Sequence, residues 1–425
     1  MSDAARRESD RVASLWRDAL TAIRSGEKVR LTARWVFPVS SSPIENGLLE
    51  IADGRIGSIE RLAGRSCPDA VDLGNSAILP SLVNAHAHLE FSDLAEPILP
   101  PAPFADWIQN LIAHRHARSE SMSNLVARGA EQSAESGTSF VGDIVTGDWL
   151  PDAATPAGSK VVAFRELIGL LPEQHDPQMQ LARSHINSCR KAGVLPAVSP
   201  HATFSVSPQL FSSLVKLAKE ERVPLCIHLA ETKAELELLE SGTGELVEML
   251  NKFGIWKGEL IERGTSPLDF LKPLADLPAA SIAHGNYLSD EELQFLAEHP
   301  NITTIFCPRT HRFFGHEAHP WRRLLAAGAP VALGTDGRSS NPDYSLWAEL
   351  QFLDKETNGT ARPDLLRMAT QNGATASGLA EFGTLEAGHQ VDPVLVPLGE
   401  DSSNDPWELL FRSAPLPTSS RSGSP

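Results

Sequence analysis

Residues 78–90 read ILPSLVNAHAHLE, an apolar run that ends in a pair of histidines and a glutamate. Seven more short apolar runs occur along the chain, and a stretch with helical spacing of apolar residues follows each run. They are GTSFVGDIV (137–145), KVVAFREL (160–167), LPAVSPHA (195–202), PLCIHLAE (224–231), SIAHGNY (281–287), ITTIFCP (302–308) and PVALGTD (330–336). Strand–helix alternation predicts an α/β fold with parallel strands, because each return to the same sheet edge needs a crossover. Eight units favour a closed (β/α)8 TIM-type barrel over the competing doubly wound open sheet.

The segments on either side of the barrel predict a second, smaller domain. Asn46-Gly47 and Asp53-Gly54 are hairpin turn signals between runs of alternating apolar residues, and strand-like alternation returns near the C-terminus. The two ends are therefore expected to meet in one small β-sandwich domain. The predicted parts are an N-terminal helical extension (1–27), the small β-sandwich domain (28–77 plus 383–412), the barrel (78–382) and a disordered Ser- and Pro-rich tail (413–425).

Composition limits the kinds of partner. The chain has 425 residues, of which 41% are hydrophobic, and its 37 basic and 54 acidic residues give a net charge of −17. This charge argues against nucleic acid and against anionic membranes as partners, so a small-molecule substrate is expected. The four cysteines form no CxxC pair, and the charged N-terminal segment lacks the apolar run of a signal peptide. We therefore expect a cytoplasmic protein with free thiols.

Polar residues stand at the ends of several predicted strands, where barrel enzymes place their active sites. Residues i and i+2 of a strand point the same way, so His86 and His88 can reach one metal ion. Alone, an HxH pair is a weak signal, His228 reads as a core histidine, and Asp336 reads equally as a helix N-cap. Together they make a set of three imidazoles and one carboxylate. This set suits Zn²⁺ or Fe²⁺ with one position left open for water.

Three further strand-end residues are candidates for catalysis or binding. Glu231 follows His228 by three residues and is either a general acid/base or a carboxylate at a helix N-terminus. His284 is either the residue that orients or deprotonates the water, or a loop residue. His201 is expected to contact substrate, because a metal would otherwise have too many ligands.

A histidine- and arginine-rich segment, CPRTHRFFGHEAHPW (307–321), is expected to form a loop that faces the substrate. Arg309 and His311 are its candidates for binding polar groups, and Glu90 joins them as a substrate-binding candidate at the end of the first run. A second metal site in this segment is disfavoured, because the spacing fits no single face of a strand or helix.

The chain resembles the amidohydrolase superfamily over roughly residues 30–397. The branch it resembles contains cytosine and guanine deaminases, adenosylhomocysteine deaminases, triazine chlorohydrolases and aminodeoxyfutalosine deaminase. HLEFSDL (88–94), PHATFSVSP (200–208) and CPRTHRFFGH (307–316) look most like aminodeoxyfutalosine deaminase-like proteins. The resemblance also implies that a homodimer is an option.

The resemblance implies one divalent metal ion, zinc first and iron second. Family members with two metals bridge them with a carboxylated lysine at the fourth strand, and LPAVSPHA has no lysine there. The ligands that it implies are His86, His88, His228 and Asp336; it also implies that Glu231 moves protons and that His284 holds the water. Two departures from the family pattern are Pro80-Ser81 for Pro-Gly and Asp336-Gly337 for Asp-Ser. The second departure lies where it would alter the substrate pocket.

The expected activity is metal-dependent hydrolytic deamination of an aminated purine-like heterocycle, such as aminodeoxyfutalosine or an adenosine derivative, with release of ammonia. Two alternatives stay open. The same scaffold can release chloride or open a cyclic amide, although Glu231 favours ammonia release. The second alternative is a non-catalytic barrel that serves as a scaffold, although all four metal-ligand candidates are present.

Overall fold

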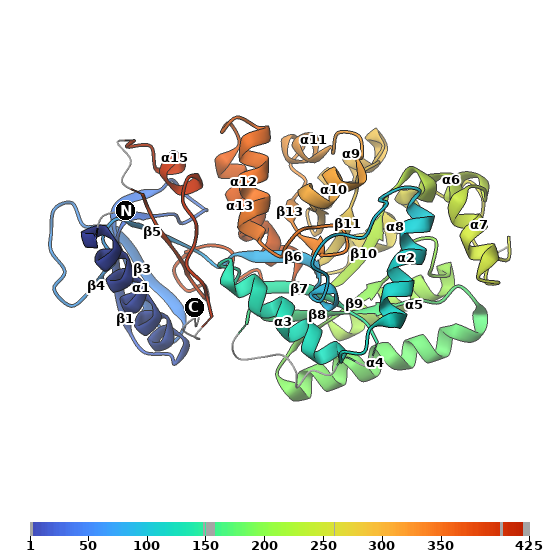
Figure 1. Cartoon of the computed structure of the whole chain (residues 1–425), viewed down its shortest axis with the longest axis horizontal. Coiled ribbons are helices and arrows are strands. Elements are labelled where there is room, and N and C mark those ends of the chain that lie inside the picture. Colours follow the sequence, from blue (N-terminus) through green and yellow to red (C-terminus); the bar gives the residue numbers. More distant parts are fainter. Residues whose placement is uncertain (1–2, 148, 150–157, 259, 400–402, 420–425) are drawn as a thin grey trace.

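The computed structural model describes residues 3–147, 149, 158–258, 260–399 and 403–419, and a parallel barrel forms its larger part (Figure 1). The barrel strands pair in the order β13-β12-β11-β10-β9-β8-β7-β6-β14. They are β6 (Val83–His88), β7 (Phe140–Val145), β8 (Lys160–Leu167), β9 (Leu195–Pro200), β10 (Leu225–Leu229), β11 (Ala280–His284), β12 (Ile302–Phe306), β13 (Val331–Leu333) and β14 (Asp336–Gly337). β13 pairs with β12 and β14 pairs with β6, so the two pieces form an eighth strand that closes the barrel. The predicted (β/α)8 barrel is confirmed.

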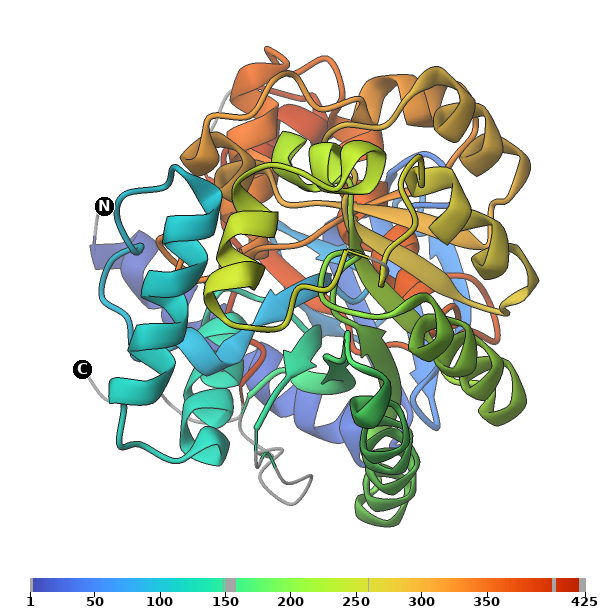
Figure 2. The same ribbon diagram turned by 90° about the vertical axis from the view of Figure 1, so that its right-hand side faces the viewer.

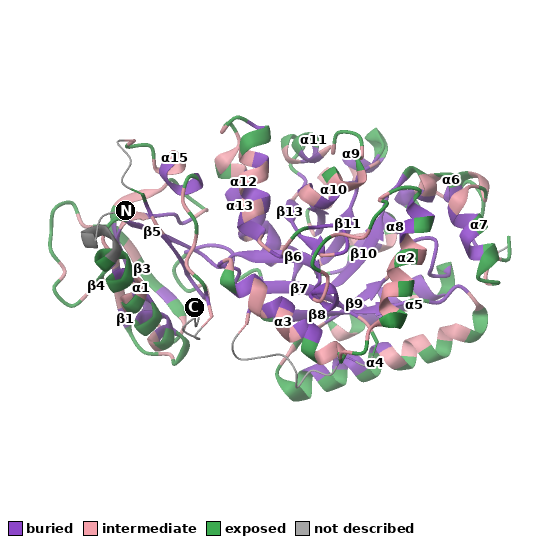
Figure 3. Cartoon of the chain, viewed as in Figure 1, coloured by how far each residue is buried: buried purple, intermediate pink, exposed green. Residues whose placement is uncertain are grey.

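Helices cover the outer face of the sheet and strand side chains fill the inside of the barrel, so both faces are buried (Figure 3). This explains the almost continuous apolar runs. Their starts follow ordinary capping chemistry: Ser207 accepts a hydrogen bond from the backbone of Leu210, and Ser289 forms a capping box with Glu292. The helices of the barrel are α2 (Phe104–Ala117), α3 (Met122–Glu135), α4 (His175–Ala192), α5 (Pro208–Glu221), α6 (Lys233–Ser241), α7 (Glu245–Lys252), α8 (Pro267–Leu271), α9 (Asp290–Glu298), α10 (Pro308–Phe314), α11 (Trp321–Ala326), α12 (Leu346–Glu356), α13 (Arg362–Ala369) and α14 (Gln371–Ala376).

The small domain contains strands from both chain ends. β15 (Val394–Pro397) pairs antiparallel with β5 (Ser76–Leu79). The remaining strands of this sheet are β1 (Val29–Val36), β2 (Ile44–Ala52), β3 (Arg55–Arg61) and β4 (Val71–Asp72). The described strands form one six-stranded sheet instead of the predicted two-sheet sandwich. Helix α1 (Asp3–Arg24) replaces the second layer, because its buried Trp16, Leu20 and Ile23 share a core with the sheet.

Two predicted boundaries move. Ile78 and Leu79 belong to the small sheet, and the barrel strand begins only at Val83, because proline at position 80 has no N–H to continue the ladder. The predicted tail is ordered over 413–419: the amides of Leu416 and Thr418 donate to the carbonyls of Leu395 and Ala134. Residues 420–425 lie outside the described residues.

Another short helix, α15 (Pro406–Phe411), follows the last strand, and Phe411 packs against Trp347 of α12. None of the described helices combines the length and apolar character needed to cross a membrane.

Candidate active site

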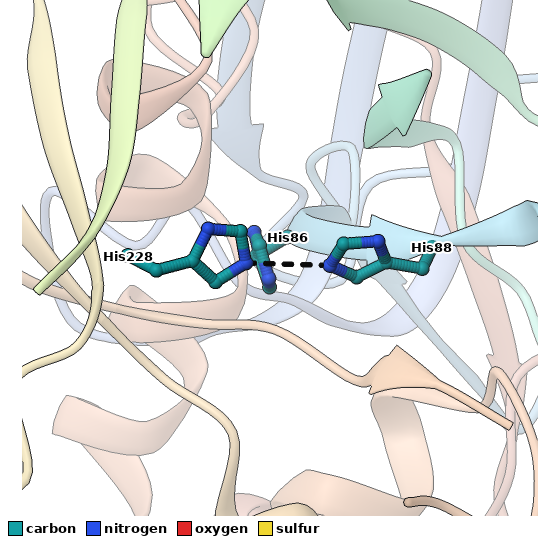
Figure 4. A group of neighbouring side chains, drawn as sticks. All are labelled: His86, His88 and His228. Carbon is teal, nitrogen blue, oxygen red and sulfur yellow. Dashed lines mark hydrogen bonds between the residues drawn. The ribbon is translucent and has the colours of Figure 1, made fainter. Parts of the chain in front are cut away.

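Three histidines converge at the carboxyl ends of two barrel strands (Figure 4). His86 and His88 come from β6 and His228 from β10, and one ring nitrogen of each lies within 4.8 Å of the others. The Nε2 atoms of His88 and His228 are 3.3 Å apart. Asp336 Oδ1 lies 3.9 Å from His86 Nε2 and 3.6 Å from His88 Nε2. The structure therefore brings the four predicted ligands together.

The protonation of these groups fits a bound cation. Burial, together with the neighbouring imidazoles, lowers the pKa of His86 and His88 well below the usual value, and burial lowers the pKa of His228 to about 4. His228 Nδ1 donates to the carbonyl of His201 at 2.8 Å, so its Nε2 keeps a free lone pair. Both ring nitrogens of His86 are buried without a hydrogen-bond partner among the described residues. Neutral imidazoles with free lone pairs beside a carboxylate are the donor set of a zinc or iron site.

Glu231 and His284 lie beside this centre. Glu231 Oε1 is 3.6 Å from His284 Nε2, and the His284 ring stacks 5.4 Å from that of His228. Burial raises the pKa of Glu231 well above its usual value, and the charges of Asp336 and Glu235 add to this effect. A carboxyl group in this environment can hold a proton near neutral pH and release it to a bound molecule.

The backbone around Glu231 is fixed by another buried acid. Glu235 accepts hydrogen bonds from the amides of Ala230 and Glu231, at 3.1 and 2.8 Å. Asn286 donates to the Glu231 carbonyl, and His319 Nε2 donates to the His284 carbonyl at 2.7 Å. Residues from several loops therefore position the two side chains.

A cavity of about 220 Å³ opens above the centre. His88, His228, Glu231, His284 and Asp336 form part of its polar wall. In Figure 2, α2 and the α6–α7 pair lie across the end of the barrel that faces the viewer. Side chains of α2, of α7 and of the loop after α7 supply the apolar wall, which includes Trp107, Ile108, Leu111, Met249, Leu250 and Phe253. A cavity that combines these polar side chains with a large apolar wall suits a flat heterocycle with an apolar substituent.

The predicted substrate-binding residues divide into two groups. His201 lines the cavity, and its Nδ1 lies 2.6 Å from Ser205 Oγ. Arg309, His311 and Glu90 are not among the lining residues in the described part of the chain.

Arg309 is bonded to Asp343 and Glu349 in the packing between α10 and α12. His311 packs against Phe306 and the rings of His316 and His319. Glu90 is buried and accepts hydrogen bonds from Arg115, Arg118 and Thr146. We correct the expectation for these three residues: their polar or aromatic partners belong to the protein itself.

Two charged residues of the cavity were missed in the sequence. Glu166 is the second-to-last residue of β8 (Lys160–Leu167), so a search for polar residues at strand ends could have found it. Arg115 lies on α2 and reaches the cavity from a helix, and no spacing in the sequence marks it.

Comparisons with known proteins agree with this geometry. The model of the amidohydrolase family matches residues 77–416. A 5-methylthioadenosine/S-adenosylhomocysteine deaminase of Moorella thermoacetica is 31% identical over 382 residues, which cover 85% of this chain and 83% of that protein. A 5'-deoxyadenosine deaminase of Methanocaldococcus jannaschii is 28% identical over 345 residues, covering 78% and 77% of the two chains.

Two solved structures share the fold. Helicobacter pylori aminofutalosine deaminase superposes with a TM-score of 0.79 at 22% identity, covering 91% of this chain and 97% of that one. The zinc complex of atrazine chlorohydrolase from Arthrobacter aurescens gives a TM-score of 0.74 at 21% identity, with 91% of each chain covered. Fold, converging strand-end histidines and the family match lead to one conclusion: this chain belongs to the amidohydrolase family.

Proposed function

We propose that this protein is a zinc-dependent deaminase that hydrolyses the C–N bond to the amino group of an adenosine-type nucleoside and releases ammonia. The observation that carries the proposal is the pair formed by Glu231 and His284 beside the four converging ligands, inside a mostly apolar cavity. The deaminase names of the two relatives at 31% and 28% identity support the adenosine-type substrate.

A cation held by His86, His88, His228 and Asp336 would supply Lewis-acid activation of water at neutral pH. The residues around it then have defined tasks. Asp336 and His284 take the proton of the attacking water. Glu231 gives its proton to the ring nitrogen next to the carbon under attack, then takes the proton of the newly formed hydroxyl group and passes it to the departing amino group. The C–N bond to the amino group breaks, a C=O bond replaces it, and one water is consumed for each ammonia released.

Ammonia release by metal-reconstituted protein tests the proposal. The panel contains adenosine-, guanine-, cytosine- and futalosine-type amines, with a chlorinated triazine and a cyclic amide as comparators. We expect turnover of adenosine-type amines, including 5′-deoxyadenosine. If no amine loses ammonia while the chlorinated or amide ring is hydrolysed, the deaminase assignment is wrong and the leaving group is a different one.

A further inference from the structure

Glu166 places a carboxyl group in the cavity wall that the deamination steps do not use. Its side chain is 4% exposed, and Oε1 has no hydrogen-bond partner among the described residues. The nearest ring nitrogen, His201 Nε2, is 3.8 Å away, which is too far for a hydrogen bond. Buried polar atoms are normally paired, because an unpaired one loses its hydration without compensation. The free oxygen therefore points to a hydrogen-bond donor supplied by the bound molecule.

Arg115 lines the same cavity and is held rigidly. Glu90 accepts hydrogen bonds from its Nε and NH2 groups, at 3.3 and 2.7 Å, and the guanidinium lies over the ring of Phe91. Its third nitrogen, NH1, makes no hydrogen bond to any residue that the structure describes. Glu90 itself is only 1% exposed, so this anchor is part of the protein interior.

Glu166 and Arg115 interact electrostatically, yet no direct ion pair joins them within the described chain. They therefore offer a fixed acceptor and a fixed donor to one ligand. A neutral group that both donates and accepts, such as the adjacent hydroxyls of a sugar, satisfies both. A cationic ligand group is disfavoured, because Arg115 already carries a positive charge beside the carboxyl group.

We propose that Glu166, with Arg115 beside it, binds the sugar hydroxyls of the nucleoside and is the specificity-determining residue of the site. This inference rests on the proposed deaminase function. His201 lies between the metal centre and Glu166, since its ring is 5.1 Å from that of His228 and its Nε2 is 3.8 Å from Glu166 Oε1. The heterocycle would thus lie over the metal centre while the sugar extends toward Glu166.

The test compares 5′-deoxyadenosine with its 2′,5′-dideoxy and 3′,5′-dideoxy counterparts. The measurement is kcat/KM for ammonia release by the zinc-loaded protein. The wild-type protein should prefer 5′-deoxyadenosine by about 100-fold over at least one dideoxy compound, because that compound leaves a buried acceptor unpaired. In Glu166→Leu the preference should fall below about fivefold, with little change in kcat/KM for the dideoxy compound. Glu166→Gln keeps the size of the side chain and should give an intermediate preference.

Glu173→Gln is the matched control, since Glu173 is exposed and follows the same strand. It should behave as the wild type, and zinc content and unfolding midpoint are measured for every variant. Equal turnover of all three nucleosides by the wild type overturns the inference and leaves the deaminase function standing. An unchanged preference for 5′-deoxyadenosine in Glu166→Leu also overturns the inference and leaves the deaminase function standing. If the leucine variant does not fold, an unchanged preference in Glu166→Gln has the same meaning. Absence of ammonia from every amine overturns the function and this inference together.

Discussion

Replacing Arg309 with methionine should destabilise the protein without weakening substrate binding. The guanidinium donates to Glu349 Oε1 at 2.7 Å and to both carboxylate oxygens of Asp343, at 3.0 and 2.7 Å. The side chain of Glu349 is 0% exposed, whereas that of Asp343 is 50% exposed. The two ion pairs therefore differ in energy.

The pair with Asp343 is half in water and should contribute at most about 1 kcal/mol. The loss at Glu349 is larger, because a buried carboxylate without its partner costs about 3–5 kcal/mol. Glu349 keeps two other donors, the Arg309 amide and Asn341 Nδ2, at 3.0 and 2.7 Å. We therefore expect the free energy of unfolding to fall by about 3 kcal/mol, near the lower end of that range.

Urea unfolding of Arg309→Met and of the double variant Arg309→Met/Glu349→Leu measures the effect. The double variant should be more stable than the single one, because it leaves no unpaired buried charge. The KM of the folded single variant should stay within about twofold of the wild type, because Arg309 does not line the cavity in the described chain. A KM raised tenfold with an unchanged unfolding midpoint would refute this reasoning and return Arg309 to the substrate.

Four other changes test the site and the core. Asp336→Ala should lower the affinity for zinc more than about 100-fold, so the purified variant should contain little zinc by elemental analysis. Full zinc content in this variant would remove Asp336 from the ligand set. Glu231→Gln should keep zinc and lose about 10²- to 10⁴-fold in kcat; wild-type turnover would exclude it as the proton carrier. His319→Gln removes the imidazole that donates a hydrogen bond to the His284 carbonyl. The kcat of this variant should fall about tenfold while zinc content and KM stay constant. An unchanged kcat would show that the contact is purely structural. Burial lowers the pKa of His185 to about 4, so the folded state keeps this imidazole neutral where the unfolded chain binds a proton. The contribution of the neutral His185 imidazole to the free energy of unfolding is complete above the usual pKa of 6.5 and is lost as the pH falls toward 4. The difference in unfolding free energy between the wild type and His185→Gln should therefore change by about 1.4 kcal/mol per pH unit near pH 5. Equal pH slopes of the unfolding free energy in the two proteins would contradict this.

The barrel could be predicted from the sequence because parallel strands covered on both faces are apolar throughout, and each is followed by a helix. The boundary between the domains could not. Apolar residues stand on both sides of Pro80-Ser81, so the apolar pattern alone does not mark the change from the small sheet to the barrel strand. That change depends on the pairing of Leu79 with Val394, and contacts so distant in sequence leave no local trace.

The convergence of the proposed metal ligands could be predicted for a related reason. A strand fixes the direction of its side chains, so His86, His88 and His228 were placed by their positions at strand ends. Arg309 shows where this logic fails. The segment around it looks like a free cationic loop, and the acids that neutralise it stand 34 and 40 residues further along the chain. Which face of α2 carries Arg115 into the cavity likewise depends on how the helix packs.

Backbone strain connects the stability of this fold to its proposed chemistry. Ala230, His284 and Asp336 have positive φ angles of 52°, 73° and 59°, and they stand next to or within the proposed catalytic set. Residues with side chains seldom adopt this conformation, which costs about 1–3 kcal/mol each and persists only where the surroundings enforce it.

Here the surroundings are buried hydrogen bonds. Glu235 holds the amide of Ala230, His319 holds the carbonyl of His284, and Ser340 Oγ donates to the carboxylate of Asp336 at 3.1 Å. Each supporting residue lies outside the set that would touch the metal or substrate. It follows that their loss should release the strained turns and displace the catalytic side chains before the barrel itself unfolds, so activity should be more sensitive than stability to changes at these positions.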